Sequence, residues 1–220
     1  RRNIMNGADK AAVRKAIRST LRALPAAVVS SASVLACQRV LPLLDQAIGV
    51  CCYLPMPKGE CDTTTLIAAL FASGKRVYVP RVEGDERHDM RMLECATEDI
   101  LASFPRSKWG IPEPTDQQAA TMDDGLVSAA IDLVVVPAVA FDRQCLRLGQ
   151  GRGYYDTFLE KLAASRASKG LPPARTVGLG LAEQLINQVP VDVHDIPLDF
   201  VCLPESTLSR LEEQERSSVA

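Results

Sequence analysis

The sequence predicts a single α/β domain with a mostly parallel central sheet and helices on both of its faces. Short, continuously apolar runs recur along the chain, and such runs are typical of strands that are buried on both faces. Amphipathic or apolar stretches of helical length separate these runs, and strands that alternate with helices indicate a parallel sheet. The chain has 220 residues, 47% of them hydrophobic, which is enough to bury one sizeable core.

The first part of the chain provides helices on either side of one strand. Apolar residues at helical spacing predict helices over residues 8–24 and about 27–46. The apolar run at residues 48–54 is short enough for a buried strand, and a loop rich in proline and glycine follows it at residues 55–60. A run of threonines then predicts the start of a helix that extends through about residue 73.

The middle of the chain contains two expected strands and a long irregular connection. We expect strands at residues 76–81 and 89–93, the second of which alternates polar and apolar side chains. Residues 104–116 hold three prolines and a glycine around Trp109. Compact domains usually keep such long irregular connections for binding.

The last part of the chain completes the sheet. Residues 131–137 form the clearest buried strand, and a glycine-rich segment separates it from a helix that begins near Tyr154. Further strands are expected at residues 176–180 and 200–203. Ligands of such folds gather at the carboxyl ends of the strands.

We expect one domain over residues 8–204, with residues 1–7 and 205–220 as terminal extensions. The second extension is polar and is expected to be a short helix or a tail. Three loops leave strands at the expected ligand edge, at residues 55–62, 81–88 and 137–153.

Charge and cysteine content narrow the classes of function. A net charge of −2, with acids and bases interspersed, excludes the overall basic surface of a nucleic-acid-binding protein. The seven cysteines contain no C-x-x-C pair, which favours buried free thiols in a reducing compartment over disulfides or a zinc site. No apolar run approaches the length of a membrane span. We expect a cytoplasmic monomer, with the mitochondrion as the alternative location.

Residues 147–156 (RLGQGRGYYD) carry the most informative pattern, in which three glycines alternate with side chains and two arginines bracket the first two of these glycines. Glycine allows backbone N–H groups to converge on an anion, and arginine suits phosphate. The following helix would add its N-terminus, a natural phosphate site. The pattern is neither a P-loop nor the dinucleotide fingerprint. The alternative is a tight turn whose glycines only relieve crowding, and we favour phosphate binding.

Two carboxylates and three basic residues are candidates for the same site. Asp156 and Asp195 can ligate Mg²⁺, which takes one or two carboxylates and fills its other positions with water and phosphate oxygens. The alternatives are a helix-dipole role for Asp156 and a solvated loop acid for Asp195. Lys10, Arg14 and Arg18 form one stripe along the first helix, which either faces solvent or reaches the phosphates.

A second set of residues suits a flat heterocycle. Glu60 can accept paired N–H donors from an amino-pyrimidine edge, or it is simply an exposed loop acid. Trp109, Tyr154, Met90 and Phe141 can line an apolar slot, although such residues are more often core. Trp109 is the best placed of them to stack on a ligand.

Together these motifs resemble the 5-formyltetrahydrofolate cyclo-ligase family over nearly the whole chain, from residue 10 to about residue 203. The most specific part is the run at residues 136–142 followed by the glycine-rich segment at residues 147–156. Further matches are Lys10 with Arg14, the loop at residues 59–63, residues 109–114, Glu183 with Gln184, and His194 and Asp195 with Asp199.

The resemblance implies cyclisation of 5-formyltetrahydrofolate to 5,10-methenyltetrahydrofolate, dependent on ATP and Mg²⁺, with release of ADP and phosphate. The reaction would pass through a phosphorylated N5-formyl intermediate, and no protein nucleophile is needed. The implied fold is similar to that of phosphosugar isomerases and CoA transferases.

The resemblance also implies roles for individual residues. Arg152 and Lys10 would be catalytic, and Asp156 and Asp195 would bind Mg²⁺. The implied ATP contacts are Lys10, Arg14, Arg147, Leu148, Gly149, Gln150, Gly151, Arg152, Gly153, Tyr154 and Tyr155. The implied contacts with the folate, which can carry a polyglutamate tail, are Leu54, Glu60, Met90, Trp109, Gln150, Gly151, Arg152, Gly153 and Tyr154.

Three positions depart from the family's usual pattern. Ala138 and Cys145 stand where relatives often have glycine, and Thr157 where they often have arginine. We expect the turn after Asp142 to be built differently as a result. Two other functions stay open: a phosphosugar-binding or isomerase relative, and a non-catalytic paralogue that binds folate or nucleotide.

Overall fold

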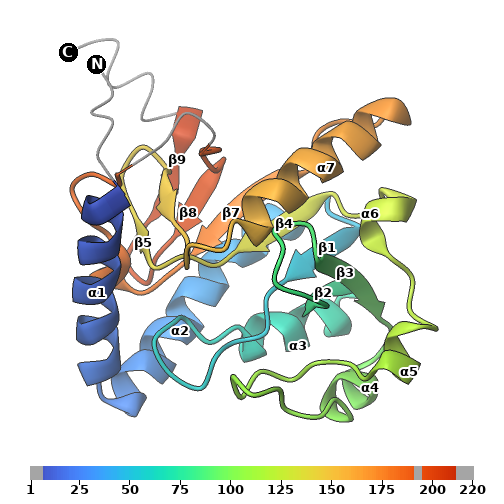
Figure 1. The fold of residues 1–220 in the computed structure, drawn as a ribbon, viewed down its shortest axis with the longest axis horizontal. Helices are drawn as coiled ribbons and strands as arrows, with labels where there is room; N and C mark the ends of the chain where they lie inside the picture. Colours follow the sequence, from blue (N-terminus) through green and yellow to red (C-terminus); the bar gives the residue numbers. More distant parts are fainter. Residues whose placement is uncertain (1–6, 191–194, 212–220) are drawn as a thin grey trace.

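A seven-stranded sheet forms the centre of the molecule in the computed structural model, which describes residues 7–190 and 195–211 (Figure 1). The strand order is β3-β2-β1-β4-β7-β8-β9. The five inner strands are parallel to one another, and the edge strands β3 and β9 are antiparallel to their neighbours. The prediction of a mostly parallel α/β sheet is confirmed.

The helices and strands have the following bounds. The helices are α1 (Gly7–Ala23), α2 (Ala26–Val40), α3 (Thr64–Ala72), α4 (Glu98–Ala102), α5 (Asp116–Ala119), α6 (Gly125–Ser128) and α7 (Tyr154–Ser168), with 3₁₀ turns η1 (Leu41–Leu44) and η2 (Ala182–Gln184). The main sheet contains β1 (Gly49–Cys52), β2 (Arg76–Val82), β3 (Met90–Cys95), β4 (Leu133–Val136), β7 (Arg175–Leu179), β8 (Phe200–Cys202) and β9 (Thr207–Ser209). A separate hairpin pairs β5 (Ala140–Phe141) with β6 (Arg147–Leu148).

Helices cover both faces of the sheet, as predicted. Along β4, Leu133 and Val135 belong to the core beneath α2 and α3, whereas Val134 and Val136 belong to the core beneath α7. This division follows from the period of two in a strand, which sends successive side chains to opposite faces. The strand is apolar throughout because both faces are buried.

Several short elements differ from the sequence prediction. Helices α4 to α6 and the β5–β6 hairpin were not predicted, because each is too short for its apolar spacing to show a period. Arg147 and Leu148, expected in the glycine loop, form strand β6. The prediction of a helix or tail from residue 205 is wrong for Thr207–Ser209, which form edge strand β9.

The second helix ends earlier than predicted and continues as a 3₁₀ turn that contains Pro42. Proline has no N–H to donate, which removes a hydrogen bond that an α-helix would need there. Within the described residues, the stretch Ala26–Leu44 has the length and apolar composition that a membrane-crossing helix needs, contrary to the sequence expectation. Its residues Ala36, Cys37 and Val40 are buried against the sheet, and core helices of soluble proteins pass the same test.

Candidate functional site

The basic stripe of α1 reaches the glycine loop rather than facing only solvent. Arg14 Nε donates to the carbonyl oxygen of Gly149 at 2.8 Å. Arg18 Nε donates to the side-chain oxygen of Gln150 at 3.1 Å. On the neighbouring face of the helix, Val13 packs against the buried residues around the β5–β6 hairpin. This packing holds α1 over the loop, so the structure brings the two predicted groups together.

Lys10, at the start of the same stripe, forms an ion pair with Asp195, with 2.8 Å between Nζ and Oδ2. Burial and the neighbouring Arg18 lower the pKa of the Arg14 guanidinium, whereas Asp195 raises it. The loop that carries Asp195 therefore lies beside the amino-terminal half of α1. Asp195 and Asp156 each lie next to basic residues of the site.

The β5–β6 hairpin positions Arg147, and Asp142 holds the hairpin's turn. The carboxylate of Asp142 accepts hydrogen bonds from the N–H groups of Gln144, Leu146 and Val189. Cys145 in this turn has a φ of 58°, the left-handed conformation that glycine favours. The turn thus forms with a cysteine in a conformation that usually selects glycine.

Arg147 lies at the base of the site as a buried cation. Its Nη2 atom is 2.5 Å from Oδ1 of Asp156, in the first turn of α7. Its side chain is only 5% exposed. Within residues 7–190 and 195–211, its Nε–H has no hydrogen-bond partner. A buried donor without an acceptor is costly to the folded protein.

Arginine side chains lie close to the positions where a side chain would begin at the three glycines of this loop. Gly151 and Gly153 have φ values of 101° and 74°, which residues with a side chain rarely adopt. A Cβ atom on Gly151 would lie 3.5 Å from Cζ of Arg14, so the backbone at this point faces the cations directly. Gly153 precedes α7 and provides no side-chain cap, so the first N–H groups of the helix remain available to a ligand.

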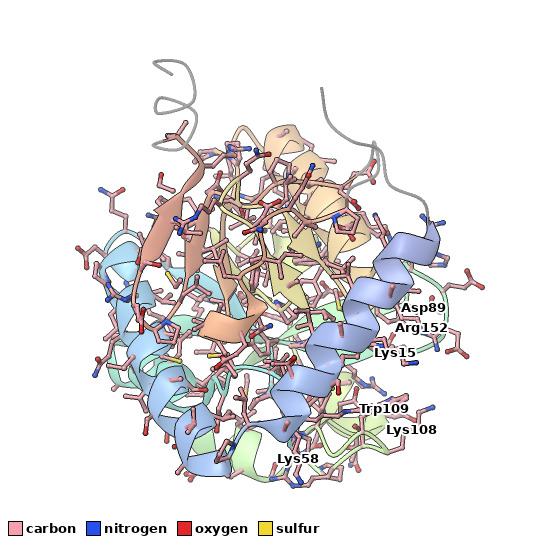
Figure 2. All side chains as sticks on the ribbon, turned by 90° about the vertical axis from the view of Figure 1, so that its left-hand side faces the viewer. Lys15, Lys58, Asp89, Lys108, Trp109 and Arg152 are labelled. Carbon is pink, nitrogen blue, oxygen red and sulfur yellow. The ribbon has the colours of Figure 1, made fainter. Side chains whose placement is uncertain are left out.

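The loop between β2 and β3 packs against the other side of the glycine loop. Tyr154 Oη donates to the carbonyl oxygen of Gly84 at 3.0 Å. The exposed side chains of Arg152 and Asp85 lie 3.7 Å apart. Figure 2 shows Arg152 and Asp89 at the same edge of the molecule, beside α1. Arg87 of this loop also lies against Gly153, which sequence reasoning missed.

Glu60 lies in the loop after β1 and is almost completely buried. Its carboxylate accepts a hydrogen bond from the N–H of Met56. Burial raises its pKa to about 7, and the bond from Met56 opposes this rise. The alternative of an exposed loop acid is wrong, because the side chain is buried, and the role of Glu60 as a binding residue stays a prediction.

Tyr155, the second residue of α7, is affected by the charges of both Glu60 and Arg147. Burial raises the pKa of its phenol well above its usual value, Glu60 raises it further, and Arg147 lowers it. Glu60 and Arg147 thus lie close enough to the phenol for both charges to affect it. In the described part of the chain, the Tyr155 hydroxyl has no hydrogen-bond partner.

The other predicted folate contacts differ in exposure. Leu54 and Met90 are buried, whereas Trp109 is 63% exposed with the Lys108 ammonium 5.5 Å from its ring centroid. The Trp109 loop touches the Glu60 loop, because a Cβ atom on Gly110 would lie 2.7 Å from Cγ of Pro57. Figure 2 shows Lys108 and Trp109 next to each other at the end of the molecule where Lys58 also lies.

Phe141 does not line a slot, and that prediction is wrong. Its side chain is fully buried, and its ring fills the space that Gly178 and Gly180 leave. A Cβ atom on Gly178 would lie 2.5 Å from Cε1 of Phe141. The two glycines of the β7 region therefore admit a core aromatic residue, not a ligand.

A transition-metal site is not found in the described residues, where no three His, Cys, Asp or Glu side chains gather to hold a metal. The seven cysteines are all buried free thiols, as predicted. His194 lies outside the described residues. Asp156 and Asp195 are each paired with a basic residue, Arg147 and Lys10 respectively, and their role as Mg²⁺ ligands stays a prediction.

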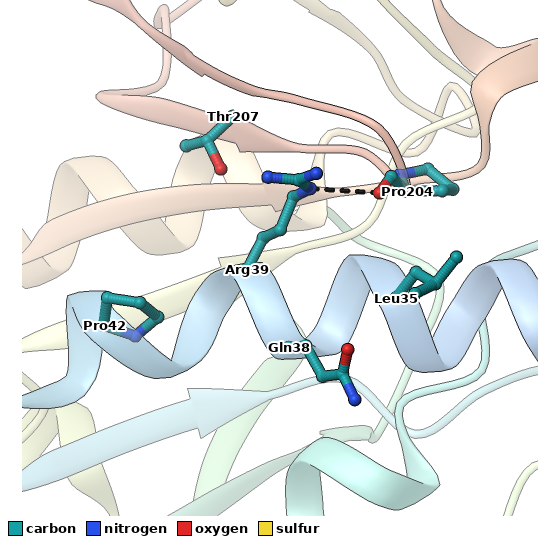
Figure 3. A pocket seen from close by; sticks show the side chains of 6 residues that line it. All are labelled: Leu35, Gln38, Arg39, Pro42, Pro204 and Thr207. Atoms are coloured by element: carbon teal, nitrogen blue, oxygen red, sulfur yellow. Dashed lines mark hydrogen bonds between the residues drawn. The ribbon is translucent and has the colours of Figure 1, made fainter.

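A pocket on another part of the surface has no connection with these residues. It lies between α2 and the turn that joins β8 to β9 (Figure 3). Arg39 Nε crosses it and donates to the carbonyl oxygen of Pro204 at 3.0 Å. No predicted site residue lines it.

Comparison with known proteins gives consistent results. The model of the 5-formyltetrahydrofolate cyclo-ligase family matches residues 6–204. The chain is 33% identical over 204 residues to a probable 5-formyltetrahydrofolate cyclo-ligase of Schizosaccharomyces pombe, covering 90% of this chain and 97% of that protein. It is 30% identical over 202 residues to the 5-formyltetrahydrofolate cyclo-ligase of Mus musculus, covering 91% and 96%.

A solved structure with a similar fold is that of 5,10-methenyltetrahydrofolate synthetase from Aquifex aeolicus. It is 25% identical to this chain with a TM-score of 0.70, and the match covers 91% of this chain and 92% of that one. The synthetase from Mycoplasma pneumoniae, at 21% identity and a TM-score of 0.66, shares the fold.

Proposed function

The chain belongs to the 5-formyltetrahydrofolate cyclo-ligase family and converts 5-formyltetrahydrofolate to 5,10-methenyltetrahydrofolate, and we propose that it does so with ATP and Mg²⁺ at the glycine loop. The observation that carries this proposal is the buried Arg147 cation, whose Nε–H is left without an acceptor beside three glycines and a helix N-terminus. We infer that a phosphate oxygen of ATP accepts that bond.

The charges around the loop support a triphosphate in particular. Arg14 contacts the loop from α1, Arg147 lies at its start in β6, and Lys10 of the same α1 stripe pairs with Asp195, in a protein whose overall charge is −2. Such local concentration of cations in an overall acidic chain suits a highly charged anion. The predicted ATP contacts in residues 147–155 include the first amides of α7, which would add a favourable helix dipole.

Asp156 and Asp195 fit a magnesium ion that is held mainly by phosphate oxygens. Each carboxylate is paired with a basic residue of the site, Asp156 with Arg147 and Asp195 with Lys10. Mg²⁺ usually takes one or two protein carboxylates and keeps several waters. We propose that these two carboxylates hold it, and that Arg147 and Lys10 then turn toward the phosphates.

The folate is proposed to bind between the Glu60 loop and Tyr154. The carboxylate of Glu60 would accept N–H groups from the amino-pyrimidine edge of the pterin. Leu54 and Met90 are buried apolar residues and Trp109 is exposed, and we propose that all three contact the folate. Two N–H donors would replace the water that Glu60 loses on burial, and its pKa near 7 would fall on binding.

The reaction requires that the formyl oxygen become a leaving group. A formyl carbonyl on nitrogen is a poor electrophile, and ATP when bound supplies the phosphoryl group that activates its oxygen. In our proposal N10 then attacks the formyl carbon and loses its proton to water, the carbon–oxygen bond breaks, and inorganic phosphate departs as the ring closes. Lys10 and Arg152 would hold the transferring phosphoryl group and neutralise its charge, a contribution that reaches about 10³–10⁵-fold for one arginine in related phosphoryl transfers.

The decisive experiment measures methenyltetrahydrofolate formation by its absorbance, together with phosphate release. Product is expected only when 5-formyltetrahydrofolate, ATP and Mg²⁺ are all present, with one phosphate released per methenyl group. Arg147→Ala should abolish turnover, whereas Arg22→Ala, an exposed change near the end of α1, should not. Product without ATP, or full turnover of Arg147→Ala, would refute the proposed phosphate site.

A further inference from the structure

Each of the three alternating glycines is faced by a different arginine. A Cβ atom on Gly149 would lie 3.2 Å from Nη1 of Arg147, and one on Gly151 would lie 3.5 Å from Cζ of Arg14. The third glycine is faced from a part of the chain that the motif does not include. A Cβ atom on Gly153 would lie 3.1 Å from Cδ of Arg87 and 4.0 Å from its Nε.

Arg87 belongs to the loop between β2 and β3, and contacts on both sides hold that loop in place. Tyr154, the first residue of α7, donates its hydroxyl to the carbonyl oxygen of Gly84. Within the loop, the Asp89 carboxylate accepts the N–H of Glu86 at 2.9 Å. A second bond, from the N–H of Glu83 to the carbonyl oxygen of Asp89 at 2.8 Å, closes the loop at its base.

Arg87 is an exposed cation, and the carboxylates of its own loop are paired with other residues. The loop is acidic, yet its ion pairs go elsewhere: Glu83 pairs with Arg81 and Arg91, and Asp85 with Arg152. Over the described ranges, no carboxylate lies within 4.0 Å of the Arg87 guanidinium. The Asp156 carboxylate in the first turn of α7 is already paired with Arg147, and a further cation at the amino end of a helix is favourable only with a further anion.

We propose that Arg87 is a nucleotide-binding residue that contacts the phosphate group held at Gly153 and the start of α7. This inference rests on the proposed function, and two observations point to an anion at the same place. The buried Nε–H of Arg147 is left without an acceptor, and α7 has no side-chain cap at Gly153. With Arg87, the phosphates are contacted from α1, from β6 and from the β2–β3 loop.

The test is ATP binding in the presence of Mg²⁺ and absence of folate, by isothermal titration calorimetry, followed by steady-state kinetics. Arg87→Ala should weaken ATP binding and raise the KM for ATP by about 10- to 100-fold, the usual worth of a charge-assisted hydrogen bond. The KM for 5-formyltetrahydrofolate should stay unchanged. Arg87→Lys should recover part of the loss, because it keeps the charge without the planar fork.

Two controls separate this inference from the proposed function and from misfolding. Arg143→Ala changes an exposed arginine in the β5–β6 turn and should bind ATP like the wild type. Arg147→Ala should lose ATP binding if the phosphate site is correctly placed. If Arg87→Ala binds ATP like the wild type and Arg147→Ala does not bind it, the proposed role of Arg87 is wrong and the phosphate site stands. Unchanged affinity in both overturns the site itself, and with it this inference.

Two further results would also count against Arg87. If Arg87→Ala raised the KM for the folate and left that for ATP unchanged, the residue would belong to the other substrate. If Arg87→Lys bound ATP no better than Arg87→Ala while both kept the wild-type melting temperature, charge at this position would not matter. Partial recovery by lysine at an unchanged melting temperature supports the proposal, because a merely structural role predicts no such charge dependence.

Discussion

Replacing the buried carboxyl of Glu60 with a carboxamide should stabilise the fold above neutral pH. Burial raises the pKa of Glu60 from the ordinary value of 4.5 to about 7. The folded protein therefore holds a proton there between about pH 4.5 and pH 7 that the unfolded chain has released. The contribution of Glu60 to stability is therefore fully present below pH 4.5, the pKa in the unfolded chain. It is lost as the pH rises toward about 7, the pKa in the folded protein.

The size of the effect follows from the same two values. One pKa unit is worth about 1.4 kcal/mol, so the difference between 4.5 and about 7 corresponds to about 3 kcal/mol at pH 8. Glu60→Gln removes this cost and can still accept the hydrogen bond from Met56. For a chain of 220 residues, such a gain corresponds to a rise of about 6–12 °C in melting temperature.

The assay is urea unfolding of the wild type and Glu60→Gln at pH 5 and at pH 8, with Glu205→Gln as an exposed control. The two proteins should differ little at pH 5, and the variant should be more stable at pH 8. The same variant should raise the KM for 5-formyltetrahydrofolate by about 10- to 100-fold, because a carboxamide loses the charged acceptor. A stability difference that is equal at both pH values would refute the burial argument.

Three more predictions concern the glycine loop and its supports. Asp156→Asn should raise the Mg²⁺ concentration for half-maximal activity by about 10- to 100-fold, measured by magnesium titration at saturating substrates, and an unchanged requirement would remove Asp156 from the metal site. Gly151 and Gly170 have positive φ values of 101° and 66°, so replacing either with alanine should cost about 1–3 kcal/mol of stability. Only Gly151→Ala should also lose ATP binding, measured by calorimetry. Cys145→Gly should be more stable than Cys145→Ala by about 1–2 kcal/mol in urea, because glycine accepts the φ of 58°. At exposed Ala163 in α7 the order should reverse, with Ala163→Gly less stable by about 1 kcal/mol, and the same order at both positions would contradict the strain at Cys145.

The sequence was sufficient to predict those elements whose apolar pattern is long or continuous. Strand β4 is apolar at every position because it lies at the centre of the sheet, so its pattern alone identifies it. The basic stripe of α1 was also predictable, since Lys10, Arg14 and Arg18 are spaced by four. The spacing did not show whether the stripe faces solvent or the glycine loop. That orientation depends on the packing of Val13 on a hairpin more than 100 residues away in the chain.

Other parts of the site depend on contacts between distant segments and carry no local signal. Arg87 stands in a run of acidic residues that reads as a solvated loop, and only the pairing of Val82 with Met90 brings it to Gly153. Phe141 reads as a candidate ligand platform, yet Gly178 on the neighbouring β7 strand leaves the space that buries it. Strand β9 has three residues and forms only because β8 offers a free edge.

The unfavourable groups of the site share one physical explanation. Glu60 is buried as a carboxyl whose pKa is about 7, Arg147 leaves a buried donor without an acceptor, and cations gather at the amino end of α7. Each of these features costs stability in the folded protein, and each would be offset by a bound group of opposite character. A folate edge would supply donors to Glu60, and phosphate would supply acceptors and negative charge to the arginines. The three destabilising features involve residues that are separate in the sequence. Selection for stability alone could therefore have replaced each of them independently. The proposed binding of folate and ATP would account for all three features together.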